Sequence, residues 1–119
     1  MLDLRGVLHL KRKLEERFMA RVTENEVALA VLRIAVTKRG DICTLDDARA
    51  EVPNHISLSK DDLKDSDTRI GEPMWHQQIR NIQSHHDVDD NFIHDGLLEH
   101  VPRVGYRATA TGKAFLQEL

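Results

Sequence analysis

The sequence predicts one mostly α-helical domain that carries a small β hairpin near its C-terminal end. The chain has 119 residues, of which 40% are hydrophobic, so it is long enough to bury one core but not two. Several segments place apolar residues at helical spacing behind a Ser, Thr or Pro that can begin a helix. Residues 98–109 instead contain two short extended runs separated by a turn with a glycine.

Residues 3–21 form the first predicted helix, which is amphipathic and basic. Residues 1–22 contain six Lys or Arg against three acids. The apolar face of this helix comprises Leu4, Val7, Leu8, Leu14, Phe18 and Val22. The helix can pack on the domain or on a second copy of the chain as a homodimer, or its basic side can lie along phosphates. We therefore divide the chain into this helix, over residues 1–22, and a domain over residues 23–119.

A capping-box pattern predicts the second helix with the clearest signal. Thr23 is the expected cap, and Glu26 follows three residues later. Apolar residues then recur at helical spacing, and the helix is expected to end at the basic residues and glycine of 38–40. Residues 41–43 read as a short extended link that can form a small strand.

Two more capping patterns predict shorter helices. Thr44–Asp47 caps a helix over residues 45–51, which Pro53 stops. Ser59–Asp62 repeats the pattern and predicts a helical turn at residues 61–64, with Leu63 as its apolar contact.

The helix predicted over residues 73–86 differs in composition from the rest of the chain. Pro73 suits the first helical position, and the acid Glu72 suits the positive end of the helix dipole. No Asp or Glu occurs in residues 73–86, although the chain contains 20 acids. One apolar stripe is expected to hold this helix to the domain, formed by Trp75, Ile79 and Ile82.

The last predicted elements complete a recognisable plan. Residues 98–102 and 106–109 read as strands joined by a turn at 103–105, and a closing helix capped by Thr109 or Thr111 follows. Helices followed by a hairpin are the plan of a winged helix, a helix-turn-helix with a β wing. In that plan the helix before the hairpin lies in the major groove of DNA, so residues 73–86 take the reading position.

The polar face of this helix carries side chains suited to reading bases. The amides of Gln77, Gln78 and Asn81 can pair with the major-groove edge of adenine. The alternative is an ordinary solvated face. Trp75 and Tyr106 also have an alternative, because an aromatic residue on an apolar stripe is usually core. The candidate DNA-binding residues are Arg69, Trp75, His76, Gln77, Arg80, Asn81, Ser84, His85, Arg103, Tyr106 and Arg107, of which the three arginines outside the helix are candidates for phosphate contacts.

Several of these motifs together resemble a known family. They are Gly71–Trp75, Ile79–Asn81, Ser84–His85, Asn91–Ile93, Gly96–Leu98, Gly105–Arg107, Thr109 and Gly112. Residues 57–118 resemble the small winged-helix domains attached to restriction endonucleases, both HNH-type and methylation-dependent. Some of those domains bind duplex DNA that contains N6-methyladenine, so the resemblance implies a reader of that mark. This sequence departs from the family because it shows no fused nuclease domain. A reader domain that stands alone, or that is truncated from a larger protein, could bind the same mark without cutting, and a nuclease partner or fusion stays open.

Composition limits the other function classes. The net charge of −3 argues against non-specific coating of nucleic acid. Cys43 is the only cysteine, which excludes an intramolecular disulfide and favours a reducing compartment. No apolar run is long enough to span a membrane and no signal peptide is apparent, so a cytoplasmic protein is expected.

The histidines invite an enzymatic interpretation that the spacing does not favour. Five of the seven histidines are His76, His85, His86, His94 and His100, with several aspartates among them. No pair has the spacing of a zinc protease motif, and no glycine-rich nucleophile or phosphate loop occurs. We therefore expect no catalytic residue, no metal and no cofactor. Two alternatives stay open: a winged helix that binds proteins or regulates transcription without methyl specificity and, more remotely, a metal-dependent nuclease.

Overall fold

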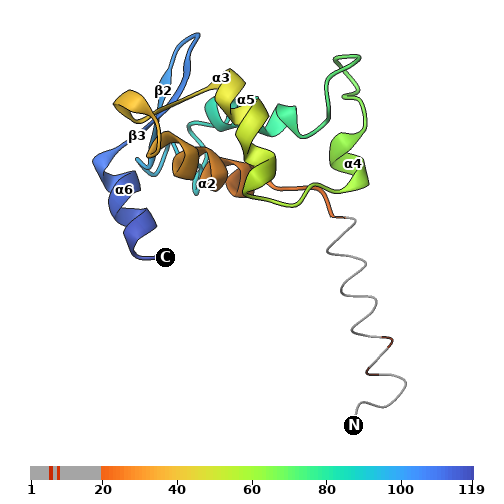
Figure 1. Ribbon diagram of the computed structural model, residues 1–119, viewed down its shortest axis with the longest axis horizontal. Coiled ribbons are helices and arrows are strands. Elements are labelled where there is room, and N and C mark those ends of the chain that lie inside the picture. Colours follow the sequence, from red (N-terminus) through yellow and green to blue (C-terminus); the bar gives the residue numbers. More distant parts are fainter. Residues whose placement is uncertain (1–5, 7, 9–19) are drawn as a thin grey trace.

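The computed structural model describes Gly6, Leu8 and residues 20–119, so most of the predicted helix over residues 3–21 lies outside the described residues. The described part forms a compact mixed α/β domain with five α-helices and a small antiparallel sheet of three strands (Figure 1). The elements in chain order are α2 (Glu24–Ala35), β1 (Ile42–Thr44), α3 (Leu45–Glu51), α4 (Lys60–Leu63), α5 (His76–Ser84), β2 (Leu98–Val101), β3 (Gly105–Ala108) and α6 (Ala110–Gln117), with 3-10 turns at Arg39–Asp41 and Val52–Asn54.

Helix α2 is the centre of the core, and it packs against α3, α5, β1 and β3. The predicted cap is confirmed, because the Thr23 hydroxyl accepts a hydrogen bond from the Glu26 N–H at 3.1 Å. The helix ends at Ala35, before the predicted basic residues and glycine. Its last turn closes early because the Thr37 hydroxyl donates to the Ile34 carbonyl at 2.7 Å, and Gly40 with φ of 72° then turns the chain into β1.

The sheet contains one strand more than a hairpin. Its order is β1-β3-β2, so the short link before α3 pairs with the last strand of the hairpin, Cys43 lying opposite Tyr106. At the next pair, in which Thr44 lies opposite Gly105, the two strands are very close. A Cβ added at Gly105 would lie 2.1 Å from the Cys43 carbonyl oxygen. Glycine at position 105 therefore allows β1 to close the sheet beside α2.

The capping boxes predicted for α3 and α4 are both present, and α3 has the predicted bounds. The predicted apolar contact of α4 is wrong, because Leu63 is 57% exposed whereas Asp62 is 1% exposed. The Asp62 carboxylate accepts hydrogen bonds from Ser59 and also from the Val22 N–H at 3.0 Å. This remote partner turns Asp62 inward. The bond also joins Val22, the last residue of the predicted N-terminal segment over residues 1–22, to the core of the domain.

Helix α5 begins at His76, and the prediction that Pro73 starts it is wrong. Residues 64–74 instead fold back on themselves as a loop, in which Pro73 forms a β-bridge with Asp65 and the Met74 N–H donates to the Lys64 carbonyl at 2.7 Å. Those backbone bonds replace the predicted first helical turn. The helix also ends two residues earlier than predicted, at Ser84.

The predicted apolar stripe of α5 is confirmed, because Trp75, Ile79 and Ile82 are all buried in the core. Tyr106 on β3 fixes the hairpin to this helix, since its hydroxyl donates to the Ile79 carbonyl at 2.5 Å. Of the two predicted caps of the closing helix, Thr109 is the one used. No helix among the described residues is long and apolar enough to cross a membrane.

Candidate nucleic-acid interface

Two projections of the domain reach out on the same side, beyond α3 and α5. They are the turn of the β2–β3 hairpin and the loop of residues 64–74, at the upper left and upper right of Figure 1. The loop is held by its own backbone, because the Ser66 N–H donates to the Glu72 carbonyl at 2.7 Å and the Glu72 N–H donates to the Arg69 carbonyl at 3.2 Å. This loop leads directly into the predicted reading helix.

The predicted base-reading side chains lie together on the side of α5 opposite its buried stripe, but they are not free. Gln77 donates to the Ser66 hydroxyl at 2.5 Å, and Asn81 donates to the Gln78 side chain at 3.2 Å. Ser84 is exposed and donates to the Arg80 carbonyl at 3.3 Å. The alternative of an ordinary solvated face does not hold for Gln77, Arg80 and Asn81, which are half-buried and hydrogen-bonded within the domain.

Glu72 is the centre of a charged cluster at the start of α5. Its carboxylate forms an ion pair with the Arg80 guanidinium, lies 3.7 Å from Arg69 and lies 3.8 Å from the ring of His76. The side chains of Glu72 and Arg80 are 19% and 30% exposed, so the pair lies at the surface but is partly shielded from water. Sequence reasoning missed this cluster because it treated Glu72 as a helix-end acid.

The cluster determines the charge states of its members. Partial burial acts to raise the pKa of Glu72, but the hydrogen bond from Arg80 and the nearby positive charges outweigh it, so the pKa lies below its ordinary value of 4.5. Burial, together with the charges of Arg49 and Arg80, lowers the pKa of His76 below 6.5 despite the opposing carboxylate. At neutral pH the cluster therefore consists of one carboxylate, its guanidinium partners and a neutral imidazole.

The hairpin carries two arginines, of which one forms an ion pair and the other does not in the described part of the chain. Arg103 lies at the turn, exposed and with φ of 66°, and no ion pair in the described part of the chain involves it. Arg107 pairs with Glu99 on the neighbouring strand at 3.1 Å. Arg103 is thus better placed than Arg107 for a phosphate contact.

Three of the predicted contact residues do not lie on the surface formed by the outward side of α5, the hairpin turn and the loop of residues 64–74. Trp75 and Tyr106 are buried in the core, so the core interpretation holds for both, and neither side chain can touch DNA in this structure. His85 follows the other end of α5, where its Nδ1 lies 2.5 Å from a carboxylate oxygen of Glu24.

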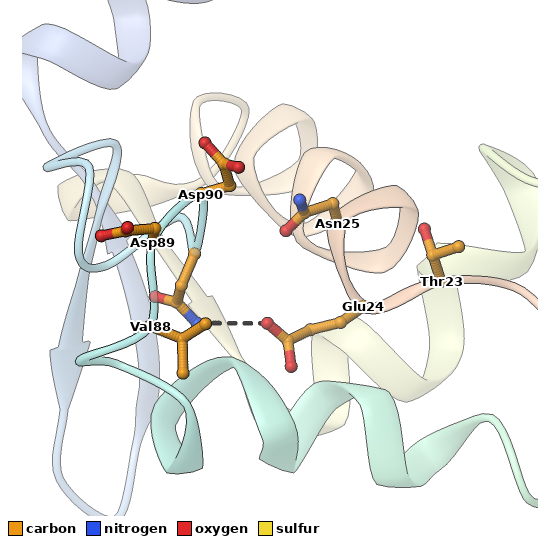
Figure 2. A pocket seen from close by; sticks show the side chains of 7 residues that line it. Thr23, Glu24, Asn25, Val88, Asp89 and Asp90 are labelled. Carbon is orange, nitrogen blue, oxygen red and sulfur yellow. Dashed lines mark hydrogen bonds between the residues drawn. The ribbon is translucent and has the colours of Figure 1, made fainter.

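A hollow beside His85 is acidic, and the sequence had not indicated it. It is lined by Thr23, Glu24, Asn25, Val88, Asp89, Asp90 and Asn91. Figure 2 shows Glu24 extending across it, and the other carboxylate oxygen of Glu24 accepts a hydrogen bond from Asn91 at 3.2 Å. Its carboxylates repel a polyanion, so this hollow is separate from the candidate interface.

The histidines do not assemble with acids into a larger site in the described part of the chain. His94 lies 3.1 Å from Asp95 and 3.8 Å from Asp89, and the hydrogen bond that its ring donates to Asp95 is the main cause that raises the His94 pKa above 6.5. Among residues 20–119, no group of three or more His, Cys, Asp or Glu side chains is arranged to hold a metal ion.

Comparison with known proteins gave no relative: no family model, no curated protein and no solved structure matches the chain.

Proposed function

We propose that this domain is a winged helix that binds double-stranded DNA, with α5 in the major groove and the β2–β3 hairpin along the backbone. The order of the elements supports the proposal, because α5 packs on α2 and is followed directly in the fold by the hairpin. The third strand, β1, supports it too, since it ties the hairpin to the start of α3. Helix α5 then occupies the position of a recognition helix.

The observation that carries the proposal is the makeup of the outward side of α5. This side presents amides, a hydroxyl and one guanidinium, and no acid lies between His76 and Ser84. Amides and guanidinium groups are the side chains that pair with base edges in the major groove. Arg69 and Arg103, on the two flanking projections, are suited to phosphates.

The connection between α3 and α5 is longer than the turn of a simple helix-turn-helix. The turn between the two helices of that motif has about three or four residues, whereas residues 52–75 separate α3 from α5 here. That insertion contains α4 and the loop of residues 64–74. The proposed interface therefore has three parts: the outward side of α5, the hairpin turn and this loop.

The sharper form of the proposal is that the domain reads N6-methyladenine, and it rests on the resemblance described above. Methylation leaves adenine one amino hydrogen and its N7 acceptor, so an amide such as that of Gln77 or Asn81 retains a partner. The burial of Trp75 means that another side chain must contact the methyl group. A nuclease, fused to the domain or separate from it, would supply any cleavage.

A titration against matched duplexes tests both forms. The duplexes are unmodified, or N6-methylated on one or both strands, and each is titrated across salt concentrations. Arg80→Ala is expected to weaken binding of the preferred duplex by about fivefold or more, because one base contact contributes about 1–3 kcal/mol. Arg103→Ala is expected to weaken all duplexes alike and to lower the salt slope by about one unit.

Arg33→Ala is the matched control, since Arg33 is an exposed arginine on α2. Equal affinity of the wild type for all duplexes would refute methyl reading but not DNA binding. Absence of binding to every duplex at low salt would refute the DNA proposal itself.

A second candidate function, protein binding, is favoured by Ile70. This side chain lies within the loop of residues 64–74 and is 97% exposed. A protein partner could bury this apolar side chain, and the net charge of −3 is also easier to reconcile with a protein partner than with a polyanion. This candidate predicts that no duplex binds at low salt.

A further inference from the structure

The proposed DNA surface contains one feature that does not favour binding to phosphates, the carboxylate of Glu72. It is an acid in the middle of the proposed DNA surface, within reach of Arg69, His76 and Arg80. Both backbone groups of Glu72 are hydrogen-bonded within the loop, so the carboxylate has a fixed base from which to reach Arg80. A surface selected only for tight binding to phosphate would not hold a carboxylate there.

The ion pair uses only part of the Arg80 guanidinium. A guanidinium carries five N–H donors, and the contact with Glu72 is made through Nη1. The remaining donors can still meet a base edge while the carboxylate stays in place. A DNA phosphate, in contrast, must displace the carboxylate or approach its negative charge. Glu72 therefore opposes phosphate contacts of Arg80 more than it opposes base contacts.

We propose that Glu72 is a specificity-determining and positioning residue, which orients Arg80 toward a base and suppresses its contacts with phosphates. This inference rests on the proposed DNA-binding function. Phosphate contacts supply nearly all of non-specific binding, whereas base contacts supply sequence discrimination. A residue that weakens only the first kind of contact raises the ratio between specific and non-specific affinity.

Removal of the Glu72 charge tests the inference. The wild type is first used to enrich a preferred duplex from a random-sequence pool, and affinities for that duplex and for the unselected pool are then measured across salt concentrations. Glu72→Gln is expected to bind the pool about three- to tenfold more tightly, with a salt slope steeper by about one unit, because Arg80 gains a phosphate. Its affinity for the enriched duplex is expected to rise less, so discrimination falls.

Two further variants separate the electrostatic role from a structural one. Glu118→Gln removes the same charge from an exposed position beyond α6 and is expected to leave both affinities close to those of the wild type. Glu72→Asp keeps the charge on a shorter side chain and is expected to retain most of the discrimination. If Glu72→Gln unfolds at the assay temperature, Glu72→Ala removes the same charge and takes its place.

The possible outcomes distinguish this inference from the proposed function. If Arg80→Ala weakens binding while Glu72→Gln matches the wild type in affinity and salt slope, DNA binding stands and the role of Glu72 is refuted. An equal gain with Glu118→Gln would refute it too, because general charge would then explain the effect. If no variant binds any duplex at low salt, the DNA-binding proposal fails and the inference fails with it.

Discussion

Replacement of Asp62 by Ala should destabilise the domain far more than the same change one residue earlier. Asp62 is 1% exposed, and its carboxylate accepts hydrogen bonds from the Val22 N–H at 3.0 Å and the Ser59 N–H at 2.8 Å. A hydrogen bond to a charged group contributes about 1.5–3 kcal/mol. Because Ala leaves both N–H groups without this partner, the low end of that range gives a loss of about 3 kcal/mol in the free energy of unfolding. That loss corresponds to a fall in Tm of roughly 12 °C.

The matched control is Asp61→Ala in the same helix. Asp61 is half-buried and pairs with Lys64 at 2.9 Å, within reach of solvent, so its loss should have a small effect. Urea unfolding followed by the fluorescence of the only tryptophan, the buried Trp75, measures both variants. Similar midpoints for the two variants would refute the argument from burial. A change in m-value for Asp62→Ala would instead indicate a different unfolded or native state.

Two other changes test the contacts that position the proposed interface. Tyr106→Phe is expected to cost about 1 kcal/mol of stability, because it removes the 2.5 Å hydrogen bond to the Ile79 carbonyl, and a urea midpoint equal to that of the wild type would contradict it. Asp47 accepts a hydrogen bond from the Thr44 N–H, the main reason that its pKa lies below 3.8, so its contribution to stability should be complete above about pH 4 and lost as the pH falls through the folded-state pKa. The urea midpoint of Asp47→Asn should therefore lie below that of the wild type at neutral pH and converge with it in acid, and a constant gap would count against the linkage.

The caps of the helices could be predicted from the sequence because they are local. Thr44 and Ser59 each bond to an acid three residues later in the chain, and no other part of the molecule is needed to form the motif. The sequence predicted β1 only as a short extended segment. Its pairing with β3 could not be predicted, because β3 lies more than half the chain away. Local signals therefore predicted most of the elements and the hairpin, but not the pairing of β1 with it.

The predictions for the start of α5 and for the inward side of α4 were wrong because a backbone contact from elsewhere in the chain outweighed the local preference. Pro73 suits the first position of a helix, but its neighbour Met74 bonds to the Lys64 carbonyl, and the first helical turn is replaced by the returning loop. Leu63 is predicted as the inward-facing residue of α4, but Asp62 accepts a hydrogen bond from the Val22 N–H and is turned inward in its place. In both cases the deciding partner is invisible to a window of a few residues.

The same loop changes how the reading side of α5 would work. Helical periodicity correctly grouped Gln77, Arg80, Asn81 and Ser84 on one side of the helix, but it could not show that the loop of residues 64–74 supplies hydrogen-bond partners to two of them. Side chains held in this way lose less conformational entropy on binding than free ones, so a correct base sequence gains affinity. The same contacts must be broken for a poorly matched duplex to bind through phosphates alone. If α5 reads DNA, its selectivity depends on this loop as much as on the helix.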